Sequence, residues 1–372
     1  MQLHSPKQSS DRAKHIRGLD GIRACAFLLV LLGHCGFSWI PNGLGVTVFF
    51  FLSGYLITTL LRLEWIQSGE ISISRFYIRR SFRILPPLYC SLILAIVFAL
   101  TGVIHSEIHW KAVIAVQLFL TNYSEFLFGA SVPAGLSVLW SLAVEEHFYL
   151  IFPWFYRNLL KAGMSQKTQV VVLCSFCVIA LAWRTVLMAA FHVPWYRVYS
   201  YSDTRLDSIL FGSILAIAAN PAIDRLSGFS RRGYAIAAII GTVALIISVA
   251  MRGEMFRQTF RYSIQGVALF PIFIYVIRYT NSFVTRFLEM RFLTHLGDLS
   301  YSLYVVHYIV LFVIEQWLPV GPLKTLFLTF SISYVIATFM RTYVELPSTR
   351  IRNQVLTRMS VRNNDKPFVQ TT

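Results

Sequence analysis

Apolar stretches of about twenty residues recur along this 372-residue chain, and they constrain its fold more than any other feature. A helix needs roughly 20 mostly apolar residues to cross a hydrocarbon core about 30 Å thick. Hydrophobic residues make up 56% of the chain and charged residues only 13%, with a mean hydropathy of +0.61. A soluble globule of this length needs more polar surface than that. The sequence therefore predicts an all-α, polytopic membrane helix bundle.

Ten segments are predicted to cross the membrane, and the distribution of basic residues supports that number. A further apolar run, 111–128, is interrupted by polar residues at 122–125. If this run does not cross, one side of the membrane holds 24 Lys and Arg residues and the other holds 6; if it crosses, the counts become 14 and 16. Cytoplasmic loops collect Lys and Arg, so both termini are expected in the cytoplasm and the run is expected to be re-entrant or interfacial on the outer side. The predicted spans are residues 20–38, 44–61, 84–104, 137–156, 169–190, 202–219, 233–251, 262–279, 297–316 and 323–340.

One transmembrane domain, residues 18–347, is expected to fill the chain between a cytoplasmic N-terminal segment at 1–17 and a cytoplasmic tail at 348–372. No cleavable signal peptide is expected, because the basic N-terminus leads directly into the first span. The net charge of +16 would suit nucleic acid. The basic residues flank the spans, however, where topology and anionic lipid headgroups account for them. A lipid bilayer is therefore an expected partner and nucleic acid is not.

Two ionisable residues, Arg23 and His34, lie in the first apolar run. Eleven helical steps of about 100° return to within about 20°, so both side chains share one face, with about 16 Å of rise between them. Asp20 lies three residues before Arg23 and can pair with it. Ionisable groups inside a membrane helix are costly, which indicates a function: His34 as a general base and Arg23 as a fixed charge lining a cavity. The alternative is a polar network that only locks helix packing.

Residues 45–55 open the second span and contain Gly45, Ser53 and Gly54. Small residues let backbones or a slim ligand approach closely, and Ser53 can donate a hydrogen bond. Because this span runs antiparallel to the first, the segment is expected near the level of His34. Taken alone, the pattern is also typical of ordinary helix packing.

The cytoplasmic start of the third span, residues 75–89, carries a cluster of arginines. Arg80 and Arg83 are three residues apart and form a two-pronged guanidinium site on a helix, with Arg79 beside them. Arginine suits phosphate because it makes bidentate, charge-assisted hydrogen bonds. Positive-inside anchoring would explain these arginines equally well.

The fourth span contains two adjacent carboxylates, Glu145 and Glu146, which are expected near the depth of His34. Adjacent residues cannot face the same way on a helix, so one is expected to face a cavity. A carboxylate facing His34 would orient the imidazole and raise its basicity. The alternative is an interhelical salt bridge with Arg184 or Arg205.

Six blocks of the sequence, taken in order, resemble the acyltransferase 3 family of integral-membrane acyltransferases. RGLDGIRACAFLLVLLGH resembles the Arg-x10-His signature of that family. The resemblance runs from about Arg17 to Pro347, and His147 stands where Gln is frequent. Larger members append an SGNH hydrolase-like domain, which is not expected here. The later blocks, in the order of the family, are GVTVFFFLSGYLI, RRSFRILPPLY, WSLAVEEHFYLIFP, DTRLDSILFG and LSYSLYVVH.

The resemblance implies transfer of an acyl group, commonly acetyl from acetyl-CoA, to a hydroxyl of a carbohydrate or lipid-linked sugar, as in O-acetylation of a surface polysaccharide. It implies that His34 is catalytic and that Arg80 and Arg83 are associated with the CoA donor. No metal is expected. The expected location is the inner, cytoplasmic membrane of a bacterium.

The residues and the resemblance together suggest a mechanism. The arginines would hold anionic CoA while its slim pantetheine arm threads toward His34, which would take the proton of the attacking hydroxyl, a step worth about 10² to 10⁴ in rate. Ser53 or a backbone amide would donate to the oxyanion. Glu145, Arg23 and Asp20 would complete the site. An acyl-His34 intermediate is the competing mechanism.

Other polar residues are expected to be mainly structural. Asp203, Arg205 and Asp207 could bind hydroxyls or pair among themselves, with structure the preferred interpretation. His307 could line the same cavity as His34, or be a packed, hydrogen-bonded residue. Glu345 and Pro347 are expected to terminate the last helix.

Two other functional classes are compatible with buried charges in a membrane bundle. A transporter or flippase would use them to mark a permeation path. Discontinuous spans at matching positions of two halves would favour that class, and the sequence shows no such internal symmetry. A catalytically silent membrane partner is the third option.

Overall fold

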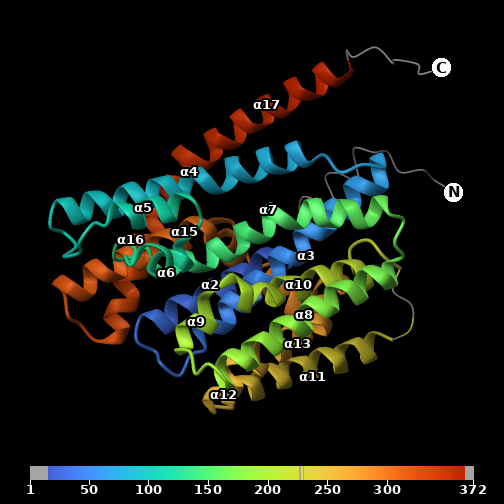
Figure 1. Ribbon diagram of the computed structural model, residues 1–372, viewed down its shortest axis with the longest axis horizontal. Coiled ribbons are helices and arrows are strands. Elements are labelled where there is room, and N and C mark those ends of the chain that lie inside the picture. Colours follow the sequence, from blue (N-terminus) through green and yellow to red (C-terminus); the bar gives the residue numbers. More distant parts are fainter. Residues whose placement is uncertain (1–15, 226–227, 229, 365–372) are drawn as a thin grey trace. The chain divides into compact units, whose positions relative to one another are not determined.

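The structure is a computed structural model that describes residues 16–225, 228 and 230–364, and every regular element in that part of the chain is a helix (Figure 1). The longer helices are α2 (Leu19–His34), α3 (Asn42–Ser68), α4 (Ile73–Leu100), α7 (Trp140–Lys161), α8 (Gln166–Ala189), α10 (Ser202–Ala218), α11 (Arg231–Ala250), α13 (Phe260–Arg278), α15 (Arg291–Trp317), α16 (Pro322–Met340) and α17 (Leu346–Asn364). The short elements are α5 (Trp110–Gln117), η1 (Thr121–Tyr123), α6 (Ser124–Phe128), η2 (Ser137–Leu139), α9 (Trp195–Ser200), α12 (Glu254–Gln258), α14 (Phe283–Leu288) and the π-helical turn η3 (Arg341–Glu345).

A helix occupies each of the ten segments predicted to cross the membrane, but among the described residues only seven helices are long and apolar enough to do so by themselves. These are α3, α4, α8, α11, α13, α15 and the continuous helical segment Pro322–Met359, which runs from α16 into α17. Of the remaining three, α2 has 16 residues and α10 has 17, fewer than the roughly 20 that a bilayer requires. The 22-residue helix α7 carries polar residues along its first half. The chain is therefore a helical membrane protein, while ten spans and cytoplasmic termini remain predictions.

The segment predicted to stay on the outer side forms α5, η1 and α6, three short helical pieces. The longest of them, α5, has eight residues, which rise only about 12 Å along a helix axis. Such a piece is too short to cross a hydrocarbon core. This finding agrees with the re-entrant or interfacial placement favoured by the basic residues.

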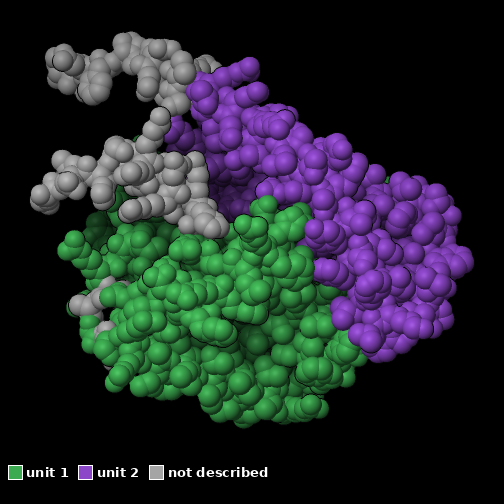
Figure 2. All heavy atoms as spheres, turned by 180° about the vertical axis from the view of Figure 1, so that it is seen from behind, with its two compact units in different colours: residues 1–71, 109–132, 137–300 green, residues 72–108, 133–136, 301–372 purple. Residues whose placement is uncertain are grey.

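The chain divides into two compact units (Figure 2). Unit 1 comprises residues 1–71, 109–132 and 137–300, and unit 2 comprises residues 72–108, 133–136 and 301–372. Unit 1 therefore holds α2, α3, α5 to α14 and the start of α15. Unit 2 holds α4, the rest of α15, α16 and α17.

Glycines allow the helices of unit 1 to pack backbone against backbone. A Cβ on Gly54 of α3 would clash with the carbonyl oxygen of Ile209 on α10, and one on Gly212 would clash with the carbonyl oxygen of Phe51. Gly45 lies in the same way against Ala26 of α2. Small residues at such crossings are the usual means of close helix packing in membranes. As a result α3 is held between α2 on one side and α10 on another.

In unit 2 the last helix does not end where the sequence predicted. The prediction that Glu345 and Pro347 terminate it is wrong, because η3 is followed directly by α17. Pro347 lies in the first turn of α17, where a missing N–H costs little. The π-helical turn before it shifts the hydrogen-bond register so that the helix continues. The predicted tail is therefore largely a helix as far as Asn364.

Candidate functional site

The start of α2 holds an ion pair that the sequence spacing predicted. Nη1 of Arg23 donates a hydrogen bond to Oδ1 of Asp20, three residues earlier. The two side chains are 18% and 20% exposed, so the pair is half-buried and still reachable by water or a ligand. Close packing of the Asp20 backbone on Gly297 of α15, within unit 1, fixes this end of α2.

His34 is the last residue of α2 and is half-buried. The chain turns back immediately after it, through Gly36 at φ +94°, a conformation that favours glycine. Gly33 lies against Asn42, the first residue of α3. His34 therefore lies where α2 ends and α3 begins, eleven residues and about 16 Å of helical rise from Arg23.

Glu145 connects α7 to α3 through a hydrogen-bonded cluster. Oγ of Ser53 donates to Oε1 of Glu145 at 3.0 Å, and the hydroxyl of Tyr149 donates to Oε2 at 3.0 Å. Each carboxylate oxygen thus accepts a hydrogen bond from a hydroxyl. This arrangement suits the ionised form, which can only accept.

The cluster lies deeper in the bundle than the sequence suggested. Ser53 follows Asn42 by eleven residues, about 16 Å along α3, and Asn42 is the residue that meets the His34 end of α2. The expectation that Ser53 and Glu145 lie at the level of His34 therefore needs correction. By helical rise they lie at the depth of Arg23, because α2 and α3 run antiparallel.

The segment that forms α5, η1 and α6 is joined to α7 and α10 by a polar network that sequence reasoning did not predict. Nδ1 of His147 lies 2.7 Å from Oγ of Ser202, and Nδ2 of Asn122 donates to the same oxygen at 3.0 Å. Asn122 also donates to the carbonyl oxygen of Ser200. Burial raises the pKa of the neighbouring Tyr123 phenol, and the charge of Asp203 acts in the same direction. These contacts give His147 a structural partner at the start of α10.

The charged residues of α10 pair with residues outside their own motif. Arg184 of α8 makes a bidentate pair with Asp207 at 2.8 and 2.7 Å, and both side chains are fully buried. Asp203 pairs with Arg197 at 2.6 Å. The residues of the motif therefore do not pair among themselves. The sequence analysis had considered a salt bridge between Arg184 and Glu145 or Glu146. The carboxylate that pairs with Arg184 is instead that of Asp207.

Arg205 is also fully buried, but aromatic rings surround it. Its guanidinium carbon lies 3.8 Å from the ring centre of Tyr262 and 5.4 Å from that of Tyr199, with two further rings within 6 Å. Nη2 donates to Oγ1 of Thr47 at 3.2 Å. Cation–π contacts of this kind can stabilise a desolvated arginine.

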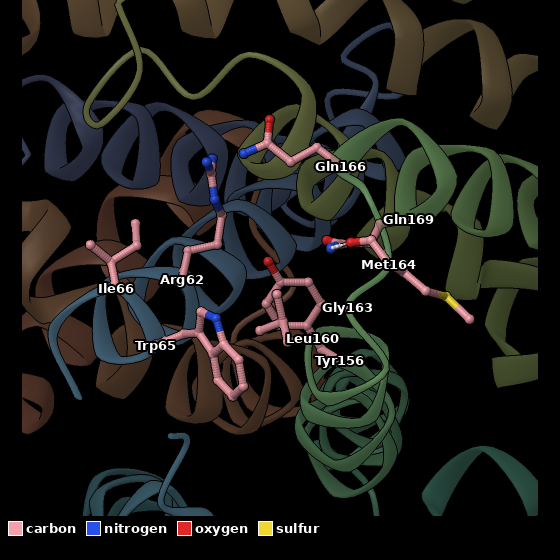
Figure 3. A pocket seen from close by; sticks show the side chains of 9 residues that line it. All are labelled: Arg62, Trp65, Ile66, Tyr156, Leu160, Gly163, Met164, Gln166 and Gln169. Atoms are coloured by element: carbon pink, nitrogen blue, oxygen red, sulfur yellow. Dashed lines mark hydrogen bonds between the residues drawn. The ribbon is translucent and has the colours of Figure 1, made fainter. Parts of the chain in front are cut away.

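A pocket of about 320 Å³ opens at the other end of α3 and α7 (Figure 3). Arg62 and Trp65 of α3, Tyr156 of α7 and Gln169 of α8 line it. The guanidinium of Arg62 is held by Asp224 through two 3.0 Å hydrogen bonds. Oε1 of the buried Gln169 has no hydrogen-bond partner among the described residues. The sequence analysis singled out none of these residues, and Arg62 lies one residue beyond the predicted span 44–61.

The arginines predicted to bind the donor lie in unit 2, as does His307. Arg79, Arg80 and Arg83 are on the first half of α4, and the Arg80 guanidinium carbon lies 5.9 Å from the ring centre of Phe76. His307 is fully buried, and its Nδ1 donates to the carbonyl oxygen of Tyr304 at 2.7 Å. His307 is thus a packed, hydrogen-bonded residue, one of the two interpretations left open. Among the residues the structure describes, no group of three or more His, Cys, Asp or Glu side chains could hold a metal ion.

The family model described as an acyltransferase domain, acyltransferase 3, matches residues 16–344. The chain belongs to this acyltransferase family. Every candidate site residue named above lies within the matched range, including Arg23, His34, Arg83 and Glu145. The family resemblance predicted from the sequence is confirmed.

Two relatives of this acyltransferase have names that describe an activity. It is 31% identical over 310 residues to the peptidoglycan O-acetyltransferase OatA of Listeria monocytogenes, covering 79% of this chain and 49% of that protein. It is 28% identical over 348 residues to the O-acetyltransferase OatA of Staphylococcus aureus, covering 90% of this chain and 57% of that protein. The chain thus spans about half the length of these relatives. No solved structure matches it.

Proposed function

We propose that this acyltransferase moves an acetyl group from cytoplasmic acetyl-CoA across a bacterial inner membrane to a hydroxyl of an extracytoplasmic carbohydrate, with peptidoglycan as the acceptor. The observation that carries the proposal is the family match over residues 16–344, within which the Arg-x10-His pair lies on one helix. The names of the relatives support acetyl as the acyl group and peptidoglycan as the acceptor. Nothing in the comparisons favours a transporter.

His34 is the proposed general base. It would take the proton of the acceptor hydroxyl as that oxygen attacks the thioester carbonyl carbon. When the tetrahedral intermediate collapses, the C–S bond breaks and the imidazolium returns the proton to the CoA thiolate. In the competing mechanism, an imidazole nitrogen attacks first and an acetyl-His34 carries the group to the acceptor. The position of His34 at the end of α2, just before the turn, would give an acceptor a short approach to it.

The deeper polar groups receive a supporting role in this proposal. Ser53 lies about 16 Å of helical rise from His34 and already donates to Glu145, so it is a poor oxyanion donor for a thioester held at His34. Ser53, Glu145 and Tyr149 instead fix α3 against α7. The Asp20–Arg23 pair, partly exposed at the same depth, would shape the electrostatics of the donor's approach.

The donor itself is assigned to Arg79, Arg80 and Arg83 of α4. Coenzyme A carries several phosphate charges, and arginine binds phosphate oxygens through bidentate, charge-assisted hydrogen bonds. The half-buried to exposed setting of these residues leaves room for such a ligand. This assignment follows the family resemblance.

Mass spectrometry of muropeptides from cells with and without the protein tests the proposed function. The expected result is a 42 Da increment per acetyl group on a sugar hydroxyl, present with wild-type protein and absent with an equally abundant His34→Ala variant. An unchanged glycan profile, with intact protein in the membrane, would exclude peptidoglycan as the acceptor. A full increment from His34→Ala would exclude His34 as the base.

A further inference from the structure

Within unit 2, α17 lies along the arginine-bearing half of α4 (Figure 1). Oγ of the buried Ser348 donates to the carbonyl oxygen of Phe82 at 2.6 Å, which joins the two helices. This hydrogen bond fixes which turn of α17 faces which turn of α4. The residues one turn away from it on each helix are therefore also neighbours.

Arg352 follows Ser348 by one helical turn and thus lies on the same face of α17. Arg79 and Arg83 lie one turn apart on α4 and flank Phe82. The positive charges of Arg83 and Arg79 both act on Arg352, and no carboxylate among the described residues is found acting on it. Three guanidinium groups from two helices therefore lie near one another where α17 packs on α4.

Positive charges gathered from two helices attract an anion. Arg352 is half-buried, so solvent screens it incompletely. Its Nε and Nη2 both donate to Oδ1 of the adjacent Asn353, at 3.2 and 3.1 Å. This neutral acceptor can be displaced by a phosphate, which binds a guanidinium fork more strongly.

We infer that Arg352 of α17 joins Arg79 and Arg83 of α4 in a binding site for phosphate esters, and that its ligand is the phosphate part of the CoA donor. The inference rests on the proposed function for the identity of the ligand, but not for the site itself. It adds a residue that lies beyond the family match, which ends at residue 344. It also assigns a role to α17: this helix adds Arg352 to the two arginines that α4 contributes.

The headgroup of an anionic lipid offers the same phosphate chemistry, and the experiment separates the two sources. The full chain is placed in nanodiscs of phosphatidylcholine, and CoA is titrated by calorimetry into wild type, Arg352→Gln, Arg352→Lys and Arg350→Gln. Arg350 is the matched control, because it is exposed and lies about 200° around α17 from Arg352. In parallel, phosphatidylglycerol retained by each variant after purification is measured.

Arg352→Gln is expected to raise the Kd for CoA about tenfold, equivalent to about 1.4 kcal/mol. Arg352→Lys should raise it less, since lysine keeps the charge but loses the fork, and Arg350→Gln should stay within about twofold. If Arg352→Gln matches Arg350→Gln in CoA affinity but loses phosphatidylglycerol, the ligand is a lipid and the donor assignment is overturned. If Arg352→Gln and Arg350→Gln have the same Kd for CoA and retain the same amount of phosphatidylglycerol, the phosphate site is overturned. A wild-type protein that binds no CoA would instead contradict the proposed function, and the lipid measurement would still decide the site.

Discussion

Unit 1 contains two groups of charged residues that differ in accessibility. The Arg184–Asp207 pair between α8 and α10 is fully buried, and Arg184 makes four hydrogen bonds there. The Asp20–Arg23 pair at the start of α2 leaves about a fifth of each side chain exposed. A fully enclosed pair can only hold helices together. An exposed pair can also respond to a ligand.

Arg184 of α8 and Arg205 of α10 differ from His34 in the same way. Arg184 has a carboxylate partner and Arg205 has aromatic rings, and neither has any exposed surface. His34 lies half-buried at a turn. We therefore expect substitutions in the enclosed group to lower stability first and substitutions near α2 to lower activity first. The following variants test this division.

Asp207→Asn should have the largest effect on stability. It leaves the Arg184 guanidinium buried without a counter-charge, which costs about 3–5 kcal/mol of unfolding free energy. The measurement is the amount of folded protein recovered from membranes and its resistance to denaturant. Asp203→Asn is the matched control, since the Arg197–Asp203 pair is 23% and 35% exposed and should contribute less than about 1 kcal/mol. Equal losses from both variants would refute the comparison.

Glu145→Gln should have an intermediate effect. The amide keeps one acceptor oxygen, so one of the hydroxyls of Ser53 and Tyr149 loses its acceptor, at a cost of about 1–3 kcal/mol in unfolding free energy. Activity per folded molecule should fall less than about tenfold, because Glu145 lies at a different depth from His34. A rate loss as large as that of His34→Ala, with unchanged stability, would show that Glu145 acts directly on His34.

Arg23→Gln should have the smallest effect on stability. The partly exposed pair with Asp20 should contribute less than about 1 kcal/mol to the unfolding free energy. If Arg23 shapes the donor's approach, the KM for acetyl-CoA should rise several-fold while kcat changes little. Unfolding in denaturant and initial rates at varied donor concentration check the two parts separately. A loss of stability comparable to that of Asp207→Asn would place Arg23 among the structural charges.

The sequence correctly predicted the features that depend on a single helix, namely where helices lie and which residues pair within one helix. Apolar runs located the helices, and the i, i+3 spacing predicted the Asp20–Arg23 pair. Such contacts follow from helical geometry, because residues three or four apart always share a face.

Contacts between helices were less predictable, because they depend on which faces meet and at what depth. Arg184 pairs with Asp207 on another helix, and the contacts found for Glu145 are with Ser53 and Tyr149. The depth of Ser53 depended on where α3 begins, at Asn42, and the helix continued through Pro347 because a π-helical turn precedes it. None of these follows from spacing alone.

The most direct test of the central claim is the rate of acetyl transfer from labelled acetyl-CoA to peptidoglycan by purified wild-type protein and His34→Ala, with unfolding measured on the same preparations. We expect His34→Ala to lose about 10² to 10⁴ in rate while its unfolding free energy changes by less than about 1 kcal/mol. Transfer at the wild-type rate, or a loss of activity that follows loss of fold, would contradict it.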